Sequence, residues 1–175
     1  MSDRSWKEQL NRTLRQCRAD AGAHGGRVAV VGVGNELNGD DAAGPLVARR
    51  LSEMRLASGE LLVVDAGPAP EAYTGLLRRF RPAVVVLVDA AHMGRPPGDV
   101  QWIPWDHVAG LSASTHTVSL RLLAEFLSAE LGCRVGLLGV QPASTAPGDP
   151  VSAPVRAAVE AVAEAIAACW REVPG

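Results

Sequence analysis

Three continuous apolar runs, rich in β-branched residues, most constrain how this chain can fold. They are RVAVVGV at 27–33, AVVVLVD at 83–89 and RVGLLGV at 134–140. A strand with one face in water alternates apolar and polar residues, whereas a strand covered on both faces is apolar throughout. The runs therefore predict parallel strands that lie between two layers of helices.

The segments between these runs predict the covering helices. Apolar residues recur at helical spacing in 42–54, 70–80, 117–131 and 155–170, and ELLVVD at 60–65 adds a further strand. Strands that alternate with helices in this way are typical of an α/β fold. We expect a three-layer α/β/α sandwich around a mostly parallel, five-stranded twisted sheet.

One connection departs from the alternation. Residues 90–98 contain MGRPPG and have no helical pattern, although a parallel return needs a crossover of a dozen or more residues. The strand DVQWI at 99–103 is therefore expected to run antiparallel, as a hairpin at the sheet edge. A peripheral N-terminal helix and linker over 1–24 are expected to complete a single domain that spans 1–175.

Composition excludes several classes of protein. The formal net charge is −2, so the chain has no global basic field to hold nucleic acid or anionic lipid. No apolar run reaches the length of a membrane helix, and the charged N-terminus does not resemble a secretory signal. Cys17, Cys133 and Cys169 have no CxxC spacing and are typical of reduced, buried thiols. We expect a cytoplasmic protein without nucleic-acid or membrane partners, and a monomer.

Candidate functional residues follow the strands, at the edge where open parallel sheets bind ligands. Asp41 ends the loop after the first run, Asp89 ends the third strand, and His116 opens the helix at 117–131. Two carboxylates and a neutral imidazole suit a weakly held divalent first-row metal. Each also has a structural alternative, because aspartates cap helices and turns and a lone histidine is often structural.

Other patterns near these residues leave further alternatives open. The loop VGVGNELNGDDAAG lacks the third glycine of GxGxxG, since Leu37 stands there, and it has no Walker lysine. Asp40 either shapes the mouth of a cleft or serves turn and cap chemistry. Trp102 and Trp105, placed on the edge strand, either form a docking patch or pack under the next helix.

Five blocks of the sequence, in this order, carry a resemblance to a known family. They are VVGVGNELNGDDAAGPLVA at 30–48, VVDAGPAPE at 63–71, VVVLVDAAHMGRPPGDV at 84–100, STHTVSLRLL at 114–123 and LLGVQP at 137–142. Together they resemble the nickel–iron hydrogenase maturation endopeptidases. The likeness is greatest to the type that processes the large subunit of the formate-hydrogenlyase hydrogenase.

The resemblance implies a protease that removes a C-terminal extension from the hydrogenase large-subunit precursor after nickel has been inserted. The positions that contact nickel in the family fall on Asp41, Asp89 and His116, which are also the expected catalytic residues. Nickel (Ni²⁺) is then the implied metal, supplied by the precursor itself. A non-catalytic metal- or nucleotide-binding module is the rival interpretation, and a spore-protein protease of similar fold is another.

Overall fold

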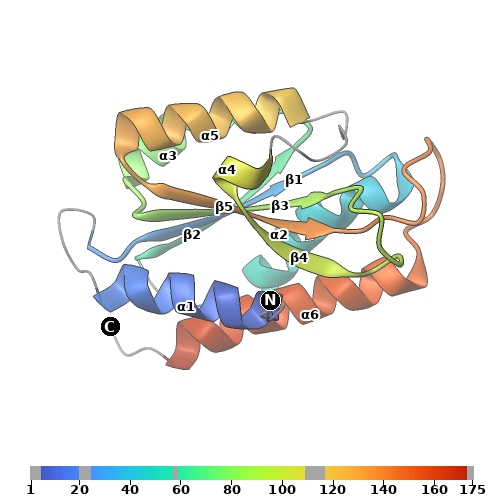
Figure 1. Ribbon diagram of the computed structural model, residues 1–175, viewed down its shortest axis with the longest axis horizontal. Helices are drawn as coiled ribbons and strands as arrows, with labels where there is room; N and C mark the ends of the chain where they lie inside the picture. Colours follow the sequence, from blue (N-terminus) through green and yellow to red (C-terminus); the bar gives the residue numbers. More distant parts are fainter. Residues whose placement is uncertain (1–4, 20–24, 57–58, 109–116, 173–175) are drawn as a thin grey trace.

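The computed structural model describes residues 5–19, 25–56, 59–108 and 117–172. Within these residues five strands form one twisted sheet in the order β2-β1-β3-β5-β4, with helices on both faces (Figure 1). The expected fold is confirmed. The strands are β1 (Val28–Val33), β2 (Leu61–Gly67), β3 (Val84–Ala90), β4 (Val100–Pro104) and β5 (Arg134–Val140).

The central strands are the ones that the apolar runs predict. Every residue of β1 and β3 is buried, and these two strands pair in parallel with Val28 opposite Val84. β2 pairs in parallel on the other side of β1, and β5 on the other side of β3. The carboxyl ends of β2, β1, β3 and β5 therefore lie at one edge of the sheet.

The expected hairpin between β3 and β4 does not form, because β4 pairs with another strand. β4 is antiparallel and lies at the sheet edge, as expected, but it pairs with β5 rather than with β3. The carboxyl half of β5 is fully buried, so it gains from neighbours on both sides, whereas β4 is mostly half-exposed and ends in Pro104. A strand of that kind tolerates an edge position. The connection after β3 therefore passes over the end of β5 before β4 begins.

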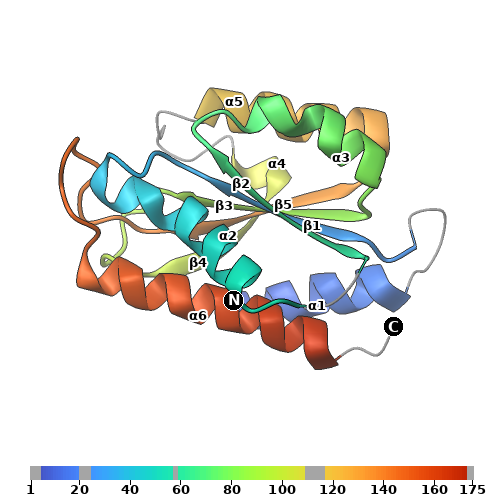
Figure 2. The same ribbon diagram turned by 180° about the vertical axis from the view of Figure 1, so that it is seen from behind.

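The helices form two layers, which Figures 1 and 2 show from opposite sides. One layer contains α3 (Thr74–Phe80), α4 (Trp105–Val108) and α5 (Thr117–Leu131); the other contains α1 (Trp6–Ala19), α2 (Ala43–Glu53) and α6 (Ala153–Glu172). Two short 3-10 helices, η1 (Gly39–Ala42) and η2 (Pro70–Tyr73), precede α2 and α3. Throughout the described part of the chain, every helix is too short or too polar to cross a bilayer.

The N-terminal helix α1 packs against α6. Its apolar stripe Leu10, Leu14 and Cys17 is fully buried. Arg18 places its guanidinium 4.4 Å from the centre of the Trp170 ring and donates a hydrogen bond of 3.0 Å to the Trp170 carbonyl. All three cysteines of the chain are buried and none forms a disulfide, as expected.

Two glycines let the start of α2 lie directly against the sheet. A Cβ atom at Gly44 would overlap the carbonyl oxygens of Val33 in β1 and Val88 in β3, and one at Gly32 would overlap the Gly44 carbonyl. The backbone of α2 is therefore in direct contact with the backbone of β1 and β3 at this point. This contact places η1, which leads into α2, over the carboxyl ends of β1 and β3.

We predict that Gly44→Ala is strongly destabilising. The added methyl group meets immobile backbone, so the free energy of unfolding should fall by about 3 kcal/mol. Urea denaturation measures the change. Gly75→Ala in α3 is the control, because the nearest atom to its added Cβ is the end of the Arg79 side chain at 3.8 Å. A Gly44→Ala variant as stable as the Gly75→Ala variant would contradict the close approach.

Candidate active site at the carboxyl edge of the sheet

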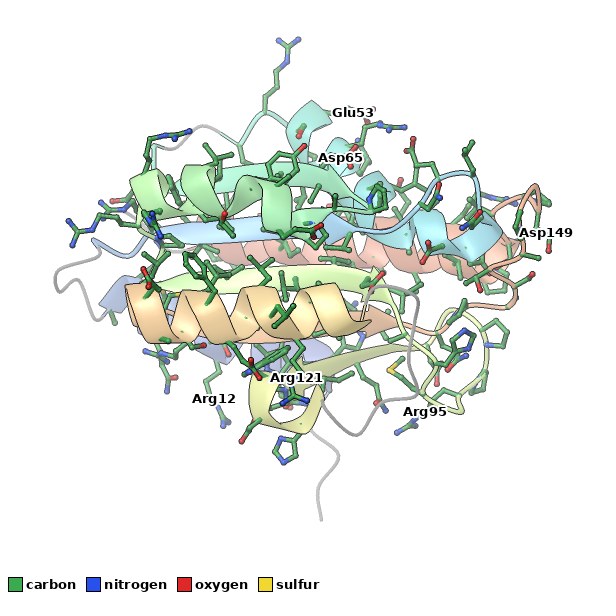
Figure 3. All side chains as sticks on the ribbon, turned by 90° about the horizontal axis from the view of Figure 1, so that it is seen from above. Arg12, Glu53, Asp65, Arg95, Arg121 and Asp149 are labelled. Carbon is green, nitrogen blue, oxygen red and sulfur yellow. The ribbon has the colours of Figure 1, made fainter. Side chains whose placement is uncertain are left out.

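Three loops meet at the carboxyl edge of the sheet. They are residues 34–42 after β1, residues 91–99 after β3, and residues 141–152 after β5 (Figure 1). Figure 3 shows Arg95 and Asp149, from the second and third of these loops, at the same end of the molecule. The site is therefore built from segments far apart in sequence that parallel pairing brings together.

Asp41 and Asp89 both reach this edge and are both buried. Asp41 lies in η1 and Asp89 is the penultimate residue of the neighbouring strand β3, against which η1 packs. Asp41 exposes only 3% of its surface to solvent, and Asp89 only 1%. The Asp41 Oδ2 atom accepts a hydrogen bond of 2.8 Å from the backbone N–H of Asn35. The structure thus brings these two expected residues to one place.

His116 lies outside the described residues, as do Ser112, Ser114 and Thr115. The helix that follows it, α5, ends at Leu131, close in sequence to the start of β5 at Arg134. The N-terminal end of α5 lies toward the carboxyl edge of the sheet (Figure 1). Among the described residues alone, no three His, Cys, Asp or Glu side chains are placed to hold a metal ion. The expected triad stays a prediction.

Two buried carboxylates at one edge favour a cation over an anion. A buried carboxylate costs free energy unless hydrogen bonds or a positive charge compensate it. Carboxylate oxygens are also ligands for divalent first-row ions, above all when an imidazole completes the set. The pyrophosphate of a nucleotide would be repelled here. The donor chemistry of Asp41 and Asp89 therefore fits a divalent metal and disfavours the nucleotide-binding alternative.

Asp40 has a different role from its neighbour Asp41. Its Oδ1 atom accepts a hydrogen bond from the Ser152 N–H at 2.7 Å. Its Oδ2 atom accepts three more, from the Ser152 hydroxyl at 2.9 Å, the Ala143 N–H at 2.8 Å and the Ser144 N–H at 3.4 Å. Neither η1 nor α2 receives a side-chain cap. Asp40 therefore anchors the loop before α6, a contact that the sequence offered no signal to find.

The surroundings of Asp40 shift its pKa. Burial alone raises the pKa of this carboxyl group, but the four hydrogen bonds that it accepts favour the charged form more strongly, so the pKa lies below its usual value. The carboxylate also lies at the N-terminus of α6, where the helix dipole favours a negative charge.

Gln141 anchors the loop on the other side of the edge. Its side-chain Oε1 atom accepts hydrogen bonds from the backbone N–H groups of Met93 at 2.7 Å and Arg95 at 3.3 Å. Its backbone accepts from Gly98 N–H and donates to the Asp99 carbonyl, both at 2.8 Å. The MGRPPG loop is thereby tied to the end of β5.

Two histidines and two tryptophans are less buried than the two aspartates. His92 and His107 are exposed, and His107 lies 3.1 Å from Asp106. Trp105 begins α4 and so does not belong to the edge strand. Trp102 is half-buried, with its ring against Gly136. Trp105 packs with the buried cluster on the α5 side of the sheet, as the packing alternative expects, whereas Trp102 packs with the cluster on the α1 and α6 side.

Comparison with known proteins adds a consistent set of likenesses. The family described as hydrogenase maturation protease (HycI) matches residues 45–169. A putative hydrogenase maturation protease of Methanocaldococcus jannaschii is 31% identical over 144 residues, which cover 78% of this chain and 79% of the relative. The hydrogenase 3 maturation protease of Escherichia coli is 38% identical over 111 residues, which cover 63% and 69%.

A solved structure is similar over almost the whole chain. The crystal structure of a nickel–iron hydrogenase maturation protease from Thermococcus kodakarensis superimposes with a TM-score of 0.77 and 33% sequence identity. The match covers 90% of this chain and 99% of that one. Sequence and fold therefore point to the same group of proteins.

The lowered pKa of Asp40 predicts a loss of stability in acid. An unfolded Asp titrates near pH 3.9, and a group whose folded pKa is lower stabilises the fold above that pH and loses this contribution as the pH falls toward the folded value. Asp40→Asn does not titrate. We expect it to lower the free energy of unfolding by about 1–3 kcal/mol at neutral pH.

Urea denaturation of both proteins across the acid range is the measurement. The difference between wild type and Asp40→Asn should be constant above about pH 5 and should shrink below about pH 4. A difference that stays the same at every pH would contradict a lowered pKa at Asp40.

Proposed function

Because this chain belongs to the hydrogenase maturation protease family, we propose that it removes the C-terminal extension of a nickel–iron hydrogenase large-subunit precursor. Cleavage follows nickel insertion into that precursor. The observation that carries the proposal is the burial of Asp41 in η1 and of Asp89 near the end of β3, against which η1 packs, in a chain that matches the family over residues 45–169.

We assign Asp41, Asp89 and His116 to contact with the nickel of the precursor. The first two supply carboxylate oxygens from η1 and β3, and His116 directly precedes α5 in the sequence. Three ligands with open positions bind a divalent ion only moderately, so ligands from the precursor complete its shell. Such sharing selects the nickel-loaded precursor over the empty one.

The assigned residues act by orientation and proton transfer. Bound to the precursor, nickel supplies a Lewis acid close to the bond that is cut. Asp41 and Asp89 hold that ion over the carboxyl edge, and an aspartate carboxylate there is a suitable acceptor for a proton of the attacking water. Burial around both side chains excludes bulk water, which strengthens electrostatic interactions.

The proposed location is the cytoplasm. The buried cysteines Cys17, Cys133 and Cys169 form no disulfide, and reduced thiols are typical of a reducing compartment. The proposed partner is the precursor alone.

The proposal is tested with purified precursor in nickel-loaded and nickel-free forms. We expect a loss of mass at the C-terminus of the loaded precursor only, measured by intact-mass spectrometry. Cleavage of both forms would overturn recognition through nickel. A chain that binds the loaded precursor without cutting it would be a binding module instead.

Substitutions test the three assigned residues. Asp41→Asn, Asp89→Asn and His116→Ala each remove a metal ligand, and we expect each to lower the cleavage rate at least about 100-fold. Circular dichroism checks that the variants fold. The control is His107→Ala, an exposed histidine in α4, which should cleave at the wild-type rate. Normal processing by His116→Ala would remove that histidine from the site.

A further inference from the structure

Consecutive aspartates in η1 are held by different parts of the chain. Asp41 accepts its hydrogen bond from Asn35, six residues earlier, whereas Asp40 is bonded to Ser152, 112 residues later. η1 is four residues long and has no side-chain cap, and its local hydrogen bonds include those of Asp41 with Asn35 and Asn38. The long-range contacts of Asp40 therefore contribute to the orientation of this turn.

The loop of residues 143–152 is fitted closely against η1. The Asp40 N–H donates to the Ser144 carbonyl at 2.9 Å. Gly39 has a φ of 57°, and a Cβ there would lie 2.7 Å from the same carbonyl oxygen. The Gly148 N–H donates to the Leu37 carbonyl at 2.8 Å. Backbone hydrogen bonds thus connect residues 37–40 to the 143–152 loop, in addition to the bonds of the Asp40 carboxylate.

The Asp40 carboxylate is occupied by these contacts. The residue is only 1% exposed, and its two oxygens accept four hydrogen bonds from the 143–152 loop. A carboxylate has about four lone-pair sites, so little capacity remains for a metal or a substrate. Of the two adjacent aspartates, Asp40 is therefore suited to hold structure and Asp41 to face a ligand.

We propose that Asp40 is a positioning residue for the cleavage reaction. It holds the backbone of η1 against the 143–152 loop, so that the Asp41 carboxylate has the correct place and direction before the precursor binds. Asp40 itself touches neither the metal nor the peptide. The inference rests on the proposed function, because it assigns Asp41 to the reaction. A misplacement of about 1 Å in a reacting group can cost about 100-fold in rate.

The test compares two substitutions that make the same chemical change in neighbouring segments. Asp40→Asn removes the charge and half of the acceptor capacity at the anchor. Asp149→Asn makes the same chemical change at an exposed residue of the 143–152 loop (Figure 3). The Asp149 carboxylate accepts a hydrogen bond from the Ser144 hydroxyl. With nickel-loaded precursor, at a temperature well below unfolding, we expect Asp40→Asn to lower kcat about 10- to 100-fold with KM within about threefold. Asp149→Asn should match wild type.

A second readout reports on Asp41 without any substrate. The Asn35 N–H donates to the Asp41 carboxylate, so its NMR shift and its hydrogen-exchange rate follow the position of that side chain. In Asp40→Asn we expect the Asn35 amide to shift and to exchange at least about tenfold faster. The amides of Val30 and Val86, in the centre of the sheet, report global opening, so their chemical shifts should stay as in wild type and their exchange should accelerate only as far as the loss of global stability requires.

The possible outcomes distinguish a role of Asp40 in positioning Asp41 from a role in stability alone. A folded Asp40→Asn variant with wild-type kcat would overturn the proposal, and so would an unchanged Asn35 amide. If Asp40→Asn does not fold, Ser152→Ala decides: it removes only the hydroxyl bond to Asp40 and should give a smaller change of the same kind in both readouts. If wild type leaves every precursor intact, the proposed function fails, while the Asn35 amide still tests whether Asp40 positions Asp41.

Discussion

The direct contact between the start of α2 and the ends of β1 and β3 underlies the rest of the structure. Gly44 has no side chain to separate the helix from the carbonyl groups of Val33 and Val88. Since a helix cannot approach a sheet this closely through ordinary side chains, the contact sets where η1 lies. It thereby places a polar turn above the carboxyl ends of two buried strands, at the edge where the candidate site forms.

The aspartates at this edge illustrate how one residue type serves two purposes. Asp40 is stabilised by four hydrogen bonds from a distant loop, and its pKa is lowered as a result. Asp41 in η1 and Asp89 near the end of β3 are both buried, and a cation would compensate their charge. A rigid anchor beside a ligand pair suits a reaction that depends on accurate placement of a metal already carried by the substrate.

Much of the architecture could be read from local patterns. Apolar runs predicted the central strands because burial on both faces leaves no place for polar residues, and helical spacing predicted α2, α5 and α6. The partner of β4 could not be predicted, because it depends on where β5 pairs after a long excursion of the chain. Asp41 and Asp89 were found from their places after strands, whereas the bonds of Asp40 to Ser152 join residues with no shared motif.

Fold class, strand positions and family resemblance were thus already present in the order of residues, because hydrophobic periodicity and recurring blocks are local properties. The different roles of Asp40 and Asp41 could not be predicted from the order of residues. Neighbouring residues of the same type have the same local chemistry, and they differ here only because the 143–152 loop folds back onto one of them. Contacts across more than 100 positions, which depend on the packed sheet, give each carboxylate its surroundings.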